Sequence, residues 1–204
     1  MCNGAWVIPV YACAAVTERP PELDEVTLRR AKDRDQDAFR RLVQRYHRAV
    51  YQLLWRMLEG TAAAGQIEDL TQETFVSVYR GLGRFDPRGP AKLSSWILTI
   101  AARGALNELR RKRPRTGALS LADNLPAVDR SDALVERREL GAAIGRALQQ
   151  LRPELRAAVL LREYHDLSYE ALAAALDVDI GTVKSRLSRA RSLQRKSLAE
   201  LADA

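Results

Sequence analysis

The stretch SYEALAAALDVDIGTVKSRLSRAR, residues 168–191, decides the fold of the C-terminal part of the chain. It reads as a short helix that the Ser168 hydroxyl can cap, a turn at 177–179, and a second helix that begins near Ile180. The small alanine side chains of the first helix allow the two helices to approach closely. The pattern predicts a helix-turn-helix, a motif whose second helix enters the major groove of DNA.

The second helix of this motif surrounds a single apolar stripe with cations. The stripe consists of residues at helical spacing that we expect to be buried: Ile180, Val183, Leu187, Ala190 and Leu193. Four polar residues then lie on the side away from the stripe: Lys184, Ser185, Ser188 and Arg189. Lys and Arg suit guanine edges and phosphates, and Ser contacts either. A solvated amphipathic helix is the alternative, but the preceding short helix and turn, and the lack of acids between 180 and 196, favour DNA binding.

Composition indicates an all-α protein. Of its 204 residues 47% are hydrophobic and only 6% aromatic, and strand-like alternation is nearly absent. The net charge of +7 fits a polyanionic partner, either nucleic acid or an anionic membrane surface. The cations gather in two runs, at 103–115 and 184–196, which favours a binding surface over a merely soluble, arginine-rich chain.

Residue types and spacing point to no catalytic or metal site. Cys2 and Cys13 lie near the N-terminus without a CxxC pair, and there is no Ser/His/Asp set, phosphate loop or metal-ligand spacing. We therefore expect no catalytic residue, no metal and no cofactor. The apolar segment 5–16 is too short to span a membrane and is broken by Pro9, so we expect a cytoplasmic protein without membrane insertion.

Helical periodicity and its interruptions divide the chain into four parts. Residues 1–22 read as a disordered tail, 23–113 as a helical domain, 114–138 as a flexible linker, and 139–204 as the helix-turn-helix domain. In the first domain we expect a long amphipathic helix over 38–58, a second at 67–82 and a third at 94–113. Ser94 or Ser95 is the expected N-cap of the third helix. The predicted fold is two small helical domains joined by a linker.

Four motifs, in this order, resemble bacterial RNA polymerase sigma factors of the small extracytoplasmic-function (ECF) class. They are DAFRRLVQRYHRAVY (37–51), DLTQETFVSVYRGLGRFD (69–86), SSWILTIAARGALNELRR (94–111) and LREYHDLSYEALAAALDVDIGTVKSRLSRAR (161–191). The resemblance covers roughly residues 24–198, with 23–113 like region two and 139–204 like region four. It implies a protein that binds core RNA polymerase, directs it to promoters and helps to open them, and it implies a separately encoded anti-sigma partner.

The resemblance assigns the helix at 67–82 to the polymerase clamp. Independently, helical spacing puts four residues on one outward face: Asp69, Gln72, Glu73 and Val76. An acidic, amide-bearing face suits an arginine-rich partner, whereas a merely solvated face is the alternative.

The resemblance also implies two sets of DNA contacts. At the minus-ten element, an unstacked base and the phosphates would be contacted by Asp86, Arg88, Lys92, Ser94, Arg103, Asn107, Arg110 and Arg111. At the minus-thirty-five element, base edges and phosphates would be contacted by Arg162, Thr182, Lys184, Ser185, Arg186, Ser188, Arg189 and Arg191. We expect Trp96 to pack in the core rather than to stack on a base.

Four positions depart from the family pattern. Relatives often have Asn where this chain has Arg103, and an arginine or a small polar residue where it has Gly104, which leaves base preference at minus-ten open. Gly in a helix interior costs about 1 kcal/mol. Many relatives carry Glu at the position of Ala171, as part of a capping box, and Gly at the position of Asp177.

The main alternative is a helix-turn-helix regulator that binds DNA without RNA polymerase. It accounts for residues 139–204 but leaves the N-terminal motifs without a role. A sigma-like protein that retains only an interaction role is a further alternative. Binding to core polymerase separates a sigma factor from a regulator.

Overall fold

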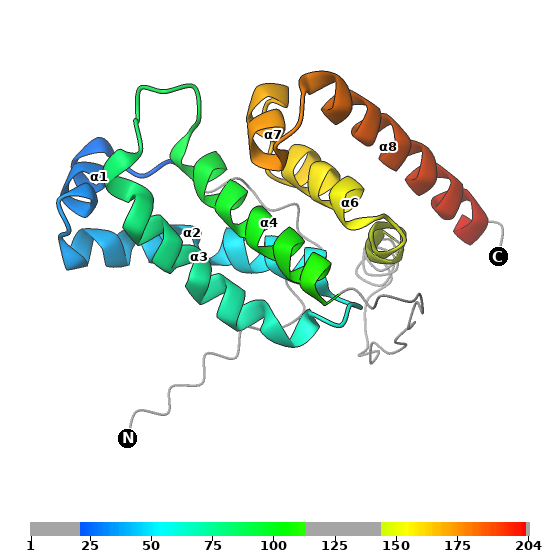
Figure 1. The fold of residues 1–204 in the computed structure, drawn as a ribbon, viewed down its shortest axis with the longest axis horizontal. Helices are drawn as coiled ribbons and strands as arrows, with labels where there is room; N and C mark the ends of the chain where they lie inside the picture. Colours follow the sequence, from blue (N-terminus) through cyan, green and yellow to red (C-terminus); the bar gives the residue numbers. More distant parts are fainter. Residues whose placement is uncertain (1–20, 113–143, 203–204) are drawn as a thin grey trace, which may run out of the picture.

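The computed structural model describes residues 21–112 and 144–202, apart from the side chains of residue 195 and residues 197–202. The predicted tail up to residue 20, the predicted linker 114–138 and the first residues of the predicted C-terminal domain lie outside the described residues. Within the described ranges every element is helical, and the helices form two groups, α1 to α4 and α6 to α8 (Figure 1). For these ranges the predicted fold of two small helical domains is confirmed.

Residues 21–112 form the N-terminal domain, which is built around one long helix. Its elements are α1 (Glu25–Lys32), α2 (Gln36–Leu58), the 3-10 turn η2 (Ala64–Gln66), α3 (Ile67–Gly81), the 3-10 turn η3 (Leu82–Arg84) and α4 (Leu93–Arg111). α2 packs against α1, α3 and α4. Six apolar side chains of α2 are completely buried: Leu42, Val50, Leu53, Leu54, Met57 and Leu58. Since burial of one such side chain contributes about 1.5–3 kcal/mol, the amphipathic stripe of α2 is a large source of stability in this domain.

Aspartates begin the first two helices. Asp24 caps α1 by accepting the Thr27 N–H at 2.8 Å, and Asp35 caps α2 by accepting the Ala38 N–H at 2.9 Å. These backbone hydrogen bonds hold the pKa of both carboxyl groups below its ordinary value. The negative charges also complement the positive ends of the helix dipoles.

The start of α4 differs from the prediction. The helix begins at Leu93 with Lys92 in the N-cap position, so neither Ser94 nor Ser95 is the N-cap. Instead, the carboxylate of Glu22 accepts the Ser94 hydroxyl and, at 3.3 Å, the Ser94 N–H. Glu22, a residue of the predicted tail, therefore supplies the acceptor and the negative charge that this helix end needs.

Residues 144–202 form the C-terminal domain and contain the predicted helix-turn-helix. A helical segment at 144–149 is followed by α6 (Pro153–Val159), the π-helical turn η4 (Leu160–Tyr164), α7 (Tyr169–Leu176) and α8 (Ile180–Ala202). Pro153 occupies the first turn of α6, where its missing N–H leaves no hydrogen bond unmade. The Ser168 hydroxyl caps α7 by accepting the Ala171 N–H at 3.1 Å, as predicted. α6 and α7 both pack on α8.

The two domains are in direct contact. α7 lies beside α4, and α6 contacts both α2 and α4 (Figure 1). The buried apolar side chains of both domains form one continuous cluster. The helix-turn-helix is therefore packed on the N-terminal domain in this structure.

Candidate nucleic-acid interface

A tight turn and a cap set the start of α8. Asp177, directly after α7, has φ 52° and ψ 54°, the left-handed conformation that usually takes glycine. Asp179 then accepts the Thr182 hydroxyl at 2.6 Å and the Thr182 N–H at 2.8 Å. Both hydrogen bonds lower the pKa of Asp179 below its ordinary value, and the bond from the Thr182 hydroxyl has the larger effect. The cap satisfies a backbone donor at the end of the helix that is predicted to enter DNA.

The apolar stripe of α8 is buried only in its middle. Val183, Leu187 and Ala190 are at most 1% exposed, as predicted. Ile180 and Leu193 were also expected to be buried, but they are 39% and 48% exposed. The reason is length: α8 has 23 residues, whereas α6 and α7 have 7 and 8, so at a rise of about 1.5 Å per residue the shorter helices leave its ends uncovered.

Opposite the buried stripe, α8 presents a polar face to solvent. All four residues predicted to face base edges are exposed: Lys184, Ser185, Ser188 and Arg189. The Ser185 hydroxyl donates to the Thr182 carbonyl at 3.0 Å, so its oxygen remains an acceptor. A face with two cations, two hydroxyls and no acid can contact both base edges and phosphates.

Three other residues predicted at the minus-thirty-five element have partners inside the domain. Arg162 donates to the Leu167 carbonyl at 2.7 Å and so braces the loop before α7. Arg191 pairs with Glu163 at 2.6 Å, which connects α8 to η4. Thr182 belongs to the cap of α8. These side chains position the recognition helix within its domain.

An acidic face of α3 points outward. Its four predicted polymerase-binding residues are all exposed: Asp69, Gln72, Glu73 and Val76. The opposite side of α3 is buried against the domain core, as its apolar spacing predicted. Val76, 46% exposed, adds apolar contact area beside two carboxylates. This combination suits a basic protein surface.

The loop before α4 exposes three of the residues predicted at the minus-ten element, Asp86, Arg88 and Lys92. Asp86 shapes this loop by accepting the Arg88 N–H at 2.9 Å. Next to the loop, Phe85 packs on Trp96 with ring centroids 5.2 Å apart. Trp96 is half-buried and packs within the domain, in agreement with the expectation.

Ser94 is placed differently from the prediction. It is 1% exposed, and its hydroxyl donates to the carboxylate of Glu22. It therefore presents no edge to a base in this structure. The physical reason is that Glu22 occupies the start of α4, which was expected to be open to DNA.

The remaining residues predicted at minus-ten follow one stripe of α4. Arg103, Asn107 and Arg110 are spaced at i, i+4 and i+7, and all three are exposed. The Arg103 guanidinium donates to the last carbonyl groups of α7. Next to this stripe, exposed Arg111 pairs with the buried carboxylate of Glu108 at 2.8 Å. The stripe of α4 that is predicted to bind DNA therefore contacts the C-terminal domain through Arg103.

Arginines from both predicted DNA sites meet in a groove of about 700 Å³ between α4, α6 and α8. The groove is lined by Arg110, Arg152, Glu154, Leu155, Arg186, Arg189, Ser192 and Leu193. Four guanidinium groups share this groove with one carboxylate, so its potential is positive. The packed arrangement brings together arginines that are predicted to contact separate promoter elements.

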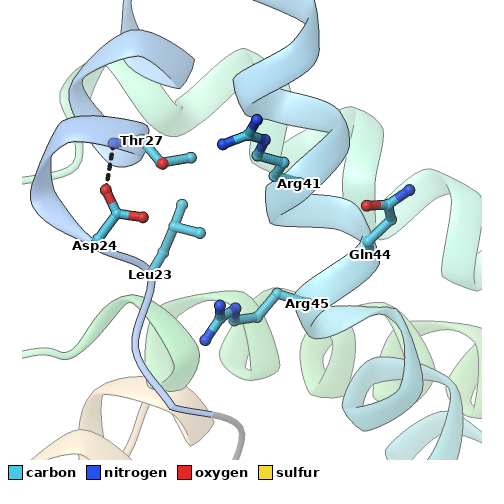
Figure 2. Close-up of a pocket in the computed structure, with 6 residues that line it drawn as sticks. All are labelled: Leu23, Asp24, Thr27, Arg41, Gln44 and Arg45. Atoms are coloured by element: carbon cyan, nitrogen blue, oxygen red, sulfur yellow. Dashed lines mark hydrogen bonds between the residues drawn. The ribbon is translucent and has the colours of Figure 1, made fainter.

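A smaller hollow of about 380 Å³ lies between the start of α1 and α2 (Figure 2). Figure 2 shows its lining residues: Leu23, Asp24, Thr27, Arg41, Gln44 and Arg45. Its one carboxylate, Asp24, is already used as the N-cap of α1. Across 21–112 and 144–202 no group of three or more His, Cys, Asp or Glu could hold a metal ion. In the same part of the chain no helix is both long and apolar enough to cross a membrane.

Sequence reasoning missed two residues that connect distant parts of the fold, Glu22 and Arg156. Arg156 is 5% exposed and donates to carbonyl groups of both domains. A local signal for it exists, because Arg156 precedes Val159 and Leu160 by three and four residues and so shares their apolar face of the helix. Glu22 has no such signal, since its partner is 72 residues away.

Two family models match the sequence, one for each domain. Residues 42–115 match Sigma-70 region 2, and residues 141–193 match Sigma-70, region 4. The RNA polymerase sigma-H factor of Pseudomonas aeruginosa is 33% identical over 190 residues, which cover 88% of this chain and 96% of that protein. The ECF RNA polymerase sigma-E factor of Escherichia coli K12 is 35% identical over 178 residues, which cover 82% of this chain and 90% of that protein.

Solved structures share the fold. The structure of CnrH in complex with the cytosolic domain of CnrY has a TM-score of 0.59 at 24% identity and covers 88% of this chain and 97% of that one. The sigma factor RpoE in complex with the anti-sigma factor NepR from Bartonella quintana has a TM-score of 0.59 at 25% identity and covers 79% of this chain and 96% of that one.

Proposed function

The chain belongs to the ECF class of the sigma-70 family, and from this premise we propose how its surfaces bind core RNA polymerase and promoter DNA. As a sigma factor it directs the polymerase to promoters and takes part in transcription initiation. A regulator that acts without polymerase is not favoured, because it leaves the region 2 match at 42–115 without a role. The protein acts in the cytoplasm by binding alone, and the polymerase makes every bond.

The acidic face of α3 binds the core polymerase. Support comes from the exposure of Asp69, Gln72, Glu73 and Val76 on one side of a helix whose other side is buried. Carboxylates at the rim of an interface steer a basic partner, and an exposed valine adds apolar area that can be desolvated on contact.

The polar face of α8 reads the minus-thirty-five element in the major groove. Lys184, Ser185, Ser188 and Arg189 are exposed together on a helix that the Asp179 cap and the buried Leu187 hold in place. Arg162, Thr182, Arg186 and Arg191 lie around this face and contact the phosphates that fix its register. The proposed function rests on one observation. The same chain carries this exposed polar face on a helix-turn-helix and the acidic face of α3.

The loop before α4 and the stripe along α4 bind the minus-ten element. Asp86, Arg88 and Lys92 supply polar edges for an unstacked base, and Arg103, Asn107, Arg110 and Arg111 follow the strand. Ser94 acts here only if Glu22 releases it, because its hydroxyl is bonded in this structure.

A separately encoded anti-sigma factor is the proposed inhibitor. The Bartonella quintana RpoE structure contains the anti-sigma factor NepR, and the groove in this chain offers four arginines to an acidic segment. Exchange of Arg152 for Glu reverses one of these charges outside both proposed DNA sites. It should weaken binding of the anti-sigma factor, measured by calorimetry, while an unchanged affinity would remove the groove from the partner interface.

Titration of core RNA polymerase with fluorescently labelled protein tests the α3 assignment. Asp69→Lys should weaken binding on the order of tenfold, because like charges then meet. Glu25→Lys is the matched control: it changes the charge equally, and Glu25 is likewise an exposed acid in the first turn of a helix, but in α1 rather than on the proposed face of α3. Equal affinities of the two variants would contradict the assignment. A chain that binds promoter duplex but not core polymerase would instead be a regulator.

A further inference from the structure

The C-terminal end of α7 is closed by a side chain from the other domain. The last carbonyl groups of a helix have no partner within it and need an external donor. The Asp177 N–H and the Val178 N–H both bond the Ala173 carbonyl, and Arg103 of α4 donates to the next two. Its Nε lies 2.9 Å from the Ala175 oxygen, and its Nη2 bonds the Ala174 oxygen. A cation at this position also complements the negative end of the α7 dipole.

A second arginine connects the domains at the other end of their contact. Arg156 of α6 donates from Nη1 to the Met57 carbonyl in the last turn of α2, at 2.9 Å. The same guanidinium donates from Nε to the Leu148 carbonyl at 2.9 Å, within its own domain. Burial lowers the pKa of Arg156 to about 10, and the nearby Glu59 acts in the opposite direction, so the side chain is charged at neutral pH. Near this point Arg56 of α2 lies over the ring of Tyr164, 4.1 Å from its centroid.

This packed arrangement cannot serve both promoter elements at once. The elements are about 25 base pairs apart, which corresponds to about 85 Å along B-form DNA at 3.4 Å per base pair. α4 and α7, which belong to the two proposed DNA-binding units, touch each other through Arg103. The domains must therefore separate before α4 and α8 can bind their elements together.

We propose that Arg103 and Arg156 form an interdomain latch that keeps the free chain closed, and that Arg103 exchanges the α7 carbonyls for a strand phosphate when the domains separate. Because the same guanidinium serves both partners, promoter binding and closure compete for one side chain. The latch also gives a role to Arg103, one of the positions where this chain departs from the family pattern. The exchange rests on the proposed DNA-binding role of α4, whereas closure does not.

Distances between two spin labels in the full chain test the closure. Ser77 of α3 and Glu170 of α7 are both exposed and can be replaced by labelled cysteines after Cys2 and Cys13 are changed to serine. Double electron–electron resonance on the unmodified latch should give one narrow distance distribution. Arg103→Met and Arg156→Met should each broaden it and shift it to longer distances.

Arg111→Met is the matched control for this measurement. It removes one guanidinium from α4 as Arg103→Met does, but Arg111 pairs with Glu108 on its own helix, so the distribution should stay narrow. A broad distribution in the unmodified chain, or narrow ones in both latch variants, would overturn the latch. Broadening in Arg156→Met alone would remove Arg103 from it. Arg156 is buried, so Arg156→Met can unfold the domain. Arg103 is exposed, so Arg103→Met tests the latch without that complication.

Salt dependence of binding to a single-stranded oligonucleotide tests the exchange. In Arg156→Met the intact Arg103 is released, so the slope of log K against log salt should steepen by about 0.7 for one further phosphate contact. An unchanged slope in a variant that the labels show to be open would overturn the exchange. Core polymerase titration of the same variant separates the two proposals, because a chain that opens but does not bind polymerase keeps the latch and loses the proposed function.

Discussion

α4 and α8 are the two helices proposed to bind promoter DNA, and the structure presents them differently. α8 exposes Lys184, Ser185, Ser188 and Arg189 on the side opposite its buried stripe. On α4, by contrast, the start of the helix is occupied by Glu22, and Arg103 is bonded to α7. The polar face of α8 is thus exposed, with Arg189 at the groove that α8 shares with α4, whereas α4 must first lose contacts within the protein.

The difference follows from what each helix packs against. α8 packs mainly on α6 and α7 of its own domain. α4 packs on α2 and α3 on one side and on α7 of the other domain as well. A helix with one covered face can be assigned a free face from its sequence, but a helix between two domains cannot.

The largest expected effect concerns the buried face of α8. Leu187→Ala should destabilise the C-terminal domain by about 2–5 kcal/mol, because the side chain is 1% exposed and its loss leaves a cavity. Denaturant unfolding followed by circular dichroism measures it, with exposed Ser188→Ala as the control, expected to change stability by less than about 0.5 kcal/mol. An unchanged midpoint together with lost duplex binding would mean that Leu187 belongs to the DNA face.

The next effect separates base contacts from phosphate contacts on α8. Arg189→Ala should cost about 1–3 kcal/mol on the cognate minus-thirty-five duplex and relax preference at one base pair. Arg191→Ala should weaken all duplexes alike and lower the salt slope by about one unit. Fluorescence anisotropy on a panel of duplexes distinguishes the two. If Arg189→Ala weakened every sequence equally, the helix would be rotated in the groove relative to this assignment.

A smaller effect is expected in the interior of α4. Gly104→Ala should raise the stability of the N-terminal domain by about 1 kcal/mol, because a Cβ there meets only Leu70 Cδ2 at an ordinary 3.8 Å. Gly81 of α3 is the comparison: a Cβ there lies 3.1 Å from Trp96 Cζ2, so Gly81→Ala should gain less or destabilise. Thermal unfolding of the two variants measures this. A loss of stability in Gly104→Ala alone would show that α4 needs glycine for a closer contact.

The smallest effect concerns the cap of α8. The pKa of Asp179 is lowered in the folded chain. Its carboxylate therefore stabilises the fold at pH values above the unfolded pKa of about 3.9, and this stabilisation is lost as the pH falls through the pKa of the folded chain. Asp179→Asn keeps an N-cap acceptor without a titrating group. Melting temperatures from pH 5 down to pH 2 should therefore fall slightly less in the variant. Parallel curves would show that this carboxylate does not contribute to acid unfolding.

The elements that depend on local spacing were predictable from the sequence, and those that depend on distant partners were not. The stripe of Val183 and Leu187 and the Ser168 cap involve residues within a few positions of one another, so the turn and both helices of the motif could be placed. Glu22 and Ser94 are 72 residues apart, and Arg156 and Met57 are 99 residues apart. The apolar spacing around Arg156 indicates that it is buried but not which residue it contacts, and nothing near Glu22 in the sequence indicates its bond to Ser94. The Ser94 cap was wrongly expected for that reason.

We propose that α8 and α4 bind two different promoter elements once the chain is on polymerase. Photocrosslinking from p-benzoylphenylalanine at Ser188 of α8 or Asn107 of α4 tests it directly, in holoenzyme bound to a promoter that it transcribes. The predicted result is a crosslink from Ser188 to the minus-thirty-five duplex and from Asn107 to the minus-ten strand, with only the Ser188 site reacting when the free chain meets the same DNA. Crosslinks from both positions to one element, or an equal reaction of Asn107 in the free chain, would contradict the account.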